Sequence, residues 1–226
     1  MAIELKEYIV AFIDLLGFSA MVQHDCERPK KEHRYIKVLY TIHLKTKELK
    51  KTIIGLEITQ FSDSVVLAIP YSQENYKKVV DVISNYQYDL LNDGILCRGG
   101  ASYGKHFSTE DFLFSNGMID AYKIESTIAL TPRVIISKEL IDLVYPASEL
   151  SKNEHLILES DGLYFINYMK NGNADDSWKA ICKVIPDELS DNPSIRSKHI
   201  WLIDYYNHQF PESKRKDNHR FVSPDA

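Results

Sequence analysis

Two aspartates stand where the chain is expected to turn, and together they could hold metal ions. Asp14 follows a continuous apolar run, residues 8–13, and Asp63 lies between two further apolar runs. Two carboxylates at one edge of a sheet repel each other unless a cation lies between them. Mg²⁺ and Mn²⁺ prefer oxygen ligands, and a pair of such ions can activate an oxygen nucleophile and stabilise a leaving pyrophosphate. Aspartate is also common in turns, so these two residues alone do not favour an enzyme over two turn residues.

The elements that must position the two aspartates have the predicted order β-α-β-β-α-β. The predicted strands cover residues 8–13, 53–61, 64–69 and 95–105, and the predicted helices cover residues 32–50 and 75–91. Only Ser62 and Asp63 separate the second and third strands, which predicts a tight hairpin with Asp63 at its tip. This order is typical of an α+β fold with a ferredoxin-like, split βαβ sheet, and we expect its helices on one face.

The helix at residues 32–50 is predicted from apolar side chains that recur at helical spacing. Its expected apolar stripe contains Ile36, Leu39, Tyr40, His43 and Leu44. A stripe of this kind usually packs against a core.

Further short elements follow. We predict a helix at residues 118–126, a strand at 133–137 and a short helix after it to about residue 144. A hairpin at 156–158 and 163–168, a polar loop at 171–176 and a last helix at 195–208 follow. One domain is expected over residues 1–210, with its core at 8–170. A polar tail, residues 211–226, is expected to be flexible.

Charge and composition exclude several classes of partner. The 226 residues carry a formal net charge of -5, which disfavours nonspecific DNA binding. The first seven residues do not resemble a signal peptide, and no apolar run approaches the length of a membrane span. The spacing of Cys26, Cys97 and Cys182 matches neither a zinc site nor a disulfide framework. We therefore expect a cytoplasmic protein with reduced thiols that binds neither nucleic acid nor membrane.

Four stretches resemble, in the same order, the motifs of class III nucleotidyl cyclases. FIDLLGFS at residues 12–19 and FSDS at residues 61–64 are similar to the two metal motifs of that family. RGGASYG at residues 98–104 is similar to its arginine-glycine strand, and GMIDAYKIE at residues 117–125 is similar to the helix that follows.

The resemblance implies a metal site and a phosphate site. The metal site would hold two Mg²⁺ or Mn²⁺ ions through Asp14, Asp63 and the backbone carbonyl of Leu15. The phosphate site would consist of Leu16, Gly17, Phe18, Ser19 and Arg98. Backbone N–H groups at the start of a helix favour an anion such as a triphosphate. For Arg98, a structural ion pair is the alternative.

The base site departs from the pattern of purine cyclases. Those enzymes place a lysine or glutamate four residues before the second aspartate, where this chain has Thr59. Ile119 and Lys123 occupy the positions of an asparagine and an arginine in the later helix, so Lys123 is the candidate catalytic cation. The candidates for the base pocket are Thr59, Glu57 and Tyr40.

Bacterial pyrimidine cyclases of the Pycsar antiphage system are more similar to this chain. The shared stretches are DLLGF at 14–18, QFSDS at 60–64, the helix at 121–125 and the C-terminal segment at 200–207. This resemblance implies conversion of UTP to cyclic UMP and pyrophosphate by a homodimer with active sites at its interface. It also implies a separate effector that the cyclic nucleotide switches on. The alternatives are a cytidylate cyclase acting on CTP, an adenylate or guanylate cyclase, and an inactive nucleotide-binding or interaction domain.

Overall fold

An eight-stranded sheet and the helices packed on it form the part of the chain that the computed structural model describes, residues 3–146, 153–186 and 188–215. The strands are β1 (Lys6–Leu15), β2 (Glu57–Phe61), β3 (Ser64–Pro70), β4 (Cys97–Ser108), β5 (Leu113–Ser115), β6 (Val134–Ile136), β7 (Leu156–Leu158) and β8 (Tyr164–Ile166). The α-helices are α1 (Phe18–Cys26), α2 (Tyr35–Thr52), α3 (Gln73–Asn92), α4 (Asn116–Thr127), α5 (Lys138–Val144), α6 (Ala174–Cys182) and α7 (Pro193–Gln209). Short 3-10 helices are η1 (Lys30–Glu32), η3 (Met169–Asn171) and η4 (Pro211–Ser213).

The strand order confirms the predicted split βαβ sheet. The order is β2-β3-β1-β4-β6-β8-β7, and β5 pairs with β4 off this path. Strand β1 is antiparallel to both β3 and β4, whereas β4 and β6 are parallel. The α+β class and the β-α-β-β-α-β order of the predicted elements are therefore confirmed, and a further helix, α1, which the sequence pattern did not predict, lies between β1 and α2.

Strand β1 is central and buried on both faces, as its continuous apolar run predicts. Ile9, Val10 and Ile13 are fully buried. Because successive side chains point to opposite faces, Ile9 and Ile13 join the core under α2 and α3, while Val10 joins a smaller cluster with Ala121 of α4. The strand therefore ends at a fixed place between two packed layers.

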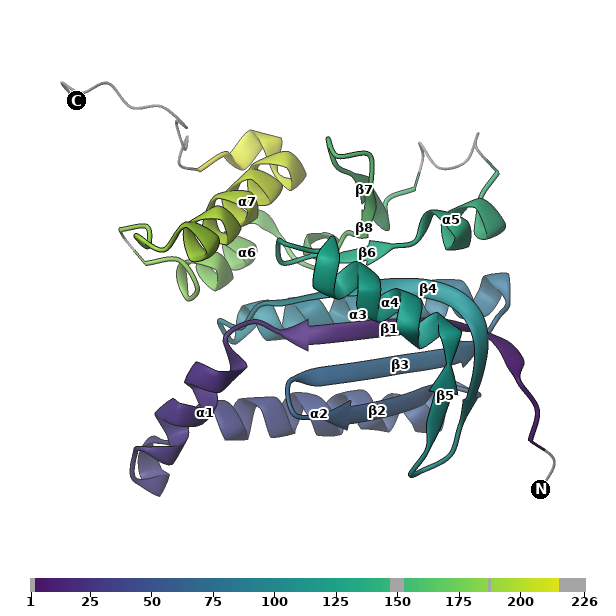
Figure 1. The fold of residues 1–226 in the computed structure, drawn as a ribbon. Helices are drawn as coiled ribbons and strands as arrows, with labels where there is room; N and C mark the ends of the chain where they lie inside the picture. Colours follow the sequence, from purple (N-terminus) through teal and green to yellow (C-terminus); the bar gives the residue numbers. More distant parts are fainter. Residues whose placement is uncertain (1–2, 147–152, 187, 216–226) are drawn as a thin grey trace.

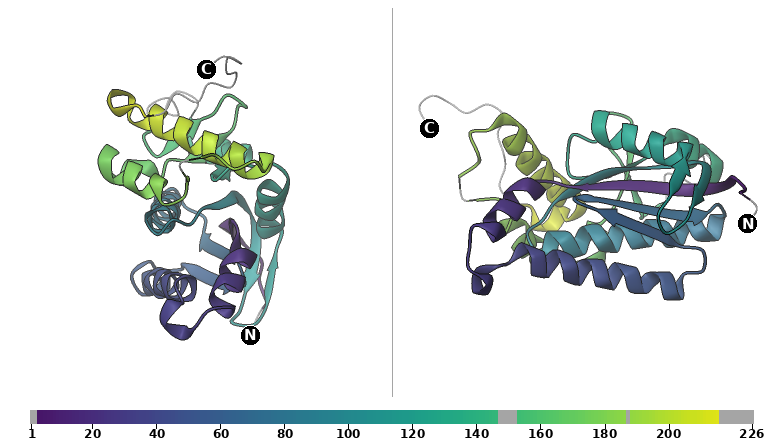
Figure 2. Two further views of the ribbon diagram at one scale, coloured as in Figure 1. Left: turned by 90° about the vertical axis from the view of Figure 1, so that its left-hand side faces the viewer. Right: turned by 60° about the horizontal axis from the view of Figure 1, so that its bottom comes forward.

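The helices cover both faces of the sheet, which corrects the expectation of helices on one face. Figure 1 shows α4 in front of the sheet and α2 and α3 behind it, and the views in Figure 2 separate the same layers. Two glycines allow α4 to lie close to β4. A Cβ atom on Gly100 would come within 2.4 Å of the carbonyl oxygen of Ala121, and one on Gly104 within 2.7 Å of Asn116 Oδ1. The glycines of the arginine-glycine stretch are thus required by packing.

Helix α2 forms as predicted, but much of its expected apolar stripe faces outward. Ile36, Tyr40 and Leu44 are 62%, 61% and 45% exposed, whereas Ile42 and Thr46 are buried. The side chains that pack on the core, such as Val38, Ile42 and Leu49, form one face along the whole helix, and this face is rotated from the expected stripe. The sequence pattern identified the helix correctly and its buried face only in part.

Strand β2 is shorter than the predicted residues 53–61. Helix α2 continues to Thr52, and the chain turns at Gly55, whose φ is 82°. The Leu56 N–H donates to the Ile53 carbonyl at 3.2 Å, which closes this turn. The apolar residues at 53 and 54 therefore belong to the helix end and turn.

The C-terminal part builds a second apolar core from β8, η3, α6 and α7. Its fully buried members include Ile181, Leu202 and Tyr206. Residues 171–176 were predicted to be a polar loop, but α6 begins at Ala174. Asn173 caps this helix, because its side chain accepts the Asp176 N–H at 2.9 Å. A cap rich in Asn and Asp has the composition of a loop, which explains the missed helix.

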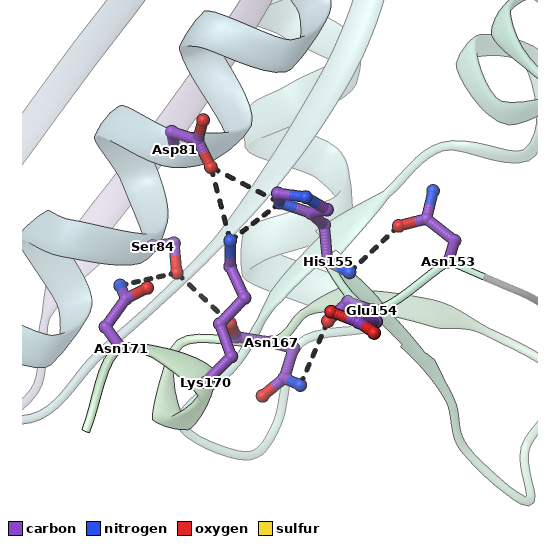
Figure 3. A network of polar contacts seen from close by, with 8 residues as sticks. All are labelled: Asp81, Ser84, Asn153, Glu154, His155, Asn167, Lys170 and Asn171. Carbon is purple, nitrogen blue, oxygen red and sulfur yellow. Dashed lines mark hydrogen bonds and ion pairs between the residues drawn. The ribbon is translucent and has the colours of Figure 1, made fainter. Parts of the chain in front are cut away.

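Polar contacts tie this C-terminal part to α3 (Figure 3). Lys170 Nζ lies 3.3 Å from an Asp81 carboxylate oxygen and 2.7 Å from His155 Nδ1. One turn further along α3, the buried Ser84 hydroxyl donates to the Asn167 carbonyl at 3.1 Å and accepts from Asn171 at 2.9 Å. These bonds fix η3 against α3.

The predicted flexible tail begins with an ordered stretch. Residues 211–213 form η4, and the Arg215 N–H donates to the Asn207 side chain at 2.8 Å. The rest of the expected tail, residues 216–226, lies outside the described residues. Within the described ranges, none of the helices is long and apolar enough to span a bilayer.

Candidate active site

Asp14 stands at the end of β1 with a strand on each side. It pairs in register with Ser64 of β3 and with Arg98 of β4. Its carboxylate lies 3.9 Å from Arg98 Nε, and its side chain is 22% exposed. The aspartate is therefore held at the sheet edge, within reach of solvent.

Asp63 is brought to the same edge by the hairpin. Strand β2 ends one residue before Ser62, whose φ of 53° provides the tight turn, and the Asp63 carbonyl accepts the Leu15 N–H at 3.0 Å. Burial raises the pKa of Asp14, and the negative charge of Asp63 raises it further, while Arg98 opposes both effects. The two carboxylates are therefore close enough to repel each other, as the sequence predicts.

Arg98 is anchored by a carboxylate that the sequence prediction did not assign. Its Nη2 lies 2.7 Å from Glu125 Oε1 on α4, and its Nη1 donates to the Ala129 carbonyl at 3.3 Å. Glu125 is only 3% exposed. Burial raises the pKa of Glu125, with Arg98 acting in the opposite direction and Asp14 adding to the rise. Glu125 lies four residues after Ala121 on α4, so the two side chains share one helix face. This spacing is the sequence feature that could have placed Glu125 against the sheet.

The turn after Asp14 supplies fewer amide groups than expected. The Leu16 N–H donates to the Leu96 carbonyl at 2.8 Å, so it is not available to a phosphate, and the expectation for Leu16 is wrong. Gly17 has a φ of 79° and precedes α1, which begins at Phe18. The first amides of a helix lack partners within it, so Gly17, Phe18 and Ser19 remain the candidate phosphate donors.

The three candidates for the base pocket do not lie together. Glu57 and Thr59 share one face of β2, whereas Tyr40 belongs to α2 behind the other face. Hydrogen bonds already engage Glu57, because Tyr8 donates at 3.1 Å and His106 Nε2 lies at 3.0 Å. Thr59 is exposed. Of the three, Thr59 is therefore the candidate that is both free of these bonds and on the face of β2 opposite α2.

Lys123 lies on the outer side of α4. The side chains of Ala121 and Glu125 face the sheet, and Lys123 between them is exposed and pairs with Asp120 at 3.1 Å. A single chain therefore does not bring Lys123 to Asp14 and Asp63.

A second cation, Lys198 of the C-terminal helix, is influenced by the charge of Arg98. Burial lowers the pKa of Lys198 on α7, and the positive charge of Arg98 lowers it further. Lys198 Nζ donates to Ser194, at 3.0 Å to the carbonyl and 2.7 Å to the hydroxyl. No motif marked this lysine, because its interaction with Arg98 depends on how α7 packs.

Comparisons with known proteins concern the fold of this chain. Neither a protein-family profile nor a curated protein matches the sequence. Among solved structures, the chain is similar to the adenylyl cyclase CyaB from P. aeruginosa, with 15% identity and a TM-score of 0.48 over 74% of this chain and 96% of that one.

Two further solved structures are guanylyl cyclases. The guanylyl cyclase Cya2 has 15% identity and a TM-score of 0.45 over 74% of this chain and 93% of that one. The guanylyl cyclase domain of the RhoGC fusion protein from Blastocladiella emersonii has 13% identity and a TM-score of 0.47 over 72% and 95%. Because the identities are low, we argue function from the side chains of this chain.

The donor atoms at the sheet edge fit hard divalent cations. Asp14 and Asp63 offer carboxylate oxygens. Leu15, which directly follows Asp14, offers its backbone carbonyl oxygen. Their mutual repulsion is the electrostatic situation that a bound cation relieves. In the described part of the chain, no group of three or more His, Cys, Asp or Glu side chains surrounds one point. Two carboxylates suit Mg²⁺ or Mn²⁺, which take further ligands from water and substrate phosphates.

Proposed function

We propose that this protein is a nucleotide cyclase that converts UTP to 3′,5′-cyclic UMP and pyrophosphate. The observation that carries the proposal is the convergence of Asp14, Asp63 and Arg98 at one sheet edge beside the start of α1. In the reaction the ribose 3′-oxygen attacks the α-phosphorus, the bond to the bridging oxygen of pyrophosphate breaks, and the hydroxyl proton passes to solvent.

The residues would divide this work between metal and phosphate binding. Asp14 and Asp63 would hold two Mg²⁺ or Mn²⁺ ions with the Leu15 carbonyl. When bound, such ions supply the charge that activates the hydroxyl and stabilises the leaving group. The amides of Gly17, Phe18 and Ser19 would bind phosphate oxygens at the helix start.

Arg98 and Lys198 would add positive charge near the polyphosphate. Both groups are partly buried and repel each other, so a bound anion would relieve this repulsion. The pair Arg98–Glu125 also orients the guanidinium in the absence of substrate.

The preference for a pyrimidine rests on the resemblance and on Thr59. A short polar side chain stands where purine cyclases have a lysine or glutamate. CTP, giving cyclic CMP, is the first alternative, and ATP or GTP is the second. As part of the same proposal, the product would activate a separate effector in antiphage defence.

A homodimer would complete the site. Exposed apolar side chains gather on the elements of the face that carries α4, namely Phe61, Phe112, Phe114, Ile119, Tyr122, Ile128 and Leu130. Lys123 and Thr59 lie on the same face. A second copy packed head to tail on this face would bury the apolar side chains and bring its Lys123 and Thr59 to the metal site.

One observation favours an inactive, nucleotide-binding domain as the second candidate. Glu125 already neutralises Arg98, and the expected asparagine of α4 is replaced by the exposed Ile119. Such a domain would bind a nucleotide without turnover.

The test is an assay of each of UTP, CTP, ATP and GTP with Mn²⁺ and with Mg²⁺. Cyclic UMP as the main product supports the proposal, and cyclic product from another nucleotide would change the assigned substrate. No cyclic product from any of the four, with nucleotide binding intact, would establish the inactive domain instead. Asp63→Ala should abolish turnover, and the exposed Asp142→Ala on α5 serves as the matched control.

A further inference from the structure

A groove that borders the acidic site lies between α1 and α2. It encloses about 460 Å³ and reaches the tip of the β2–β3 hairpin. Its lining includes Met21 of α1, Tyr35, Leu39 and Tyr40 of α2, and Gln60 of β2. A cavity of this size accommodates one or two large side chains.

The groove continues into an exposed apolar ridge. Ile36, Tyr40 and Leu44 follow one another at four-residue spacing on α2 and are all at least 45% exposed. Val22 of α1, on the opposite wall, is 44% exposed. Contiguous exposed apolar side chains next to a pocket are typical of a protein interaction site.

The segment that contains α2, one wall of this groove, is strongly positive, whereas the acidic Asp25 in the lining accepts the Arg34 and Ile36 N–H groups. Residues 28–51 contain nine lysines and arginines and two glutamates, a net charge of +7 in a chain whose total is -5. Lys37 and Lys47 stand one helical turn from Tyr40 and Leu44. Among the described residues, neither of these two lysines forms an ion pair, in contrast to Lys45, which pairs with Asp89 at 2.5 Å. The surface is therefore electrostatically complementary to an acidic partner.

We propose that this groove docks an acidic, amphipathic segment of a protein partner. An apolar anchor, aromatic or aliphatic, would fill the space between Met21 and Tyr40, and carboxylates beside it would pair with Lys37 and Lys47. A protein segment suits the concave shape, because it can insert a side chain into a pocket, whereas a bilayer presents no such anchor. The groove borders the proposed catalytic site, because Phe18 and Ser62 also line it, but the docking proposal does not depend on the cyclase reaction.

The experiment uses the full chain and a defined probe. The probe is a fluorescein-labelled helical peptide of about 18 residues, with leucine and phenylalanine along one face and glutamate elsewhere. A second peptide carries lysine in place of glutamate. Fluorescence anisotropy should show that the acidic peptide binds and the lysine peptide does not. The affinity for the acidic peptide should fall as the salt concentration increases.

Two variants test the two halves of the site. Ile36→Ser with Tyr40→Ser removes the apolar ridge, and Lys37→Glu with Lys47→Glu reverses the charge. Each should weaken binding at least about tenfold. The matched control is Leu143→Ser with Lys138→Glu on the exposed side of α5, which should bind as the wild type does.

Three outcomes would overturn the proposal. These are no binding of the acidic peptide, equal binding of both peptides, and binding that the groove variants leave unchanged. Vesicles of phosphatidylcholine with about 30% phosphatidylglycerol provide the comparison with a membrane. Sedimentation with these vesicles that the same variants abolish, without peptide binding, would assign the surface to lipid.

Discussion

At the scale of single residues, the candidate site is a small group of charges that oppose one another. Burial and the charge of Asp63 both disfavour the ionised form of Asp14, and only Arg98 favours it. Such a group is unfavourable in the metal-free protein and becomes favourable when a cation binds. Stability and function should therefore respond in opposite directions to substitutions at Asp14.

Asp14→Asn should raise the thermal midpoint of the metal-free protein while abolishing turnover. Folding raises the pKa of Asp14 above its ordinary value of 3.8. The folded state therefore loses stability as the pH rises from 3.8 through the raised pKa. The substitution removes that loss, so the difference from the wild type should be greatest at neutral pH and vanish in acid. Calorimetry in EDTA at several pH values measures it. A lower midpoint at neutral pH would contradict the electrostatic assignment.

Arg98→Ala should destabilise the protein by about 3 kcal/mol, because it leaves the buried Glu125 without a counter-charge. Urea unfolding gives the magnitude. Adding Glu125→Gln to this variant should restore much of the stability but no turnover. If the Arg98→Ala protein is as stable as the wild type, the Arg98–Glu125 ion pair has no structural role.

The sequence predicted Asp14, Asp63 and Arg98 because each lies in a short contiguous motif. It did not predict that Glu125 holds Arg98 or that the charge of Arg98 influences Lys198. These relations arise from the packing of α4 and α7, which are distant in sequence from β4. The same limit explains Leu16, whose amide is engaged by Leu96 across the strand end.

At the scale of elements, the position of α4 depends on glycines in β4. The side of Gly100 that would carry a Cβ faces the carbonyl of Ala121 and the side chain of Ile124. Hydrophobic periodicity predicts that a helix forms, but not which face of the sheet it covers. For this reason the β-α-β-β-α-β order was predicted correctly, whereas helix α1 and the two-sided arrangement of helices were not.

Gly100→Ala should displace α4 and cost about 2 kcal/mol of unfolding free energy by overpacking. Turnover should fall with it, since Glu125 moves with α4. Gly162→Ala is the control: its Cβ would meet open space, but its φ of 84° makes the substitution cost about 1 kcal/mol by backbone strain alone. Urea unfolding should show a loss of stability for both variants, whereas the cyclase assay should show a loss of turnover for Gly100→Ala alone. An active Gly100→Ala protein of wild-type stability would contradict the packing account.

At the scale of the whole molecule, a shared active site predicts complementation between two defective chains. Asp63→Ala removes the metal site, and Lys123→Ala removes the cation that the other chain would supply. Each protein alone should lose turnover. An equal mixture should recover about a quarter of the wild-type activity, because half the dimers are mixed and each contains one intact site.

The controls for this mixture are a second Asp63→Ala preparation and the size of the particle. Mixing two Asp63→Ala samples should recover nothing. Light scattering should give the mass of a dimer. A monomer that is fully active would remove the need for a partner's Lys123.

The two apolar cores have a practical consequence for watching the molecule unfold. Both tryptophans of the chain, Trp178 and Trp201, pack against the C-terminal core. Intrinsic tryptophan emission therefore reports the layer of α6 and α7, while far-ultraviolet circular dichroism reports every helix. If the ferredoxin-like sheet and the C-terminal layer form one cooperative domain, the two signals should change at the same denaturant concentration. If α6 and α7 detach first, the emission should change first, and the layer that carries Lys198 will be lost before the sheet that holds Asp14 unfolds.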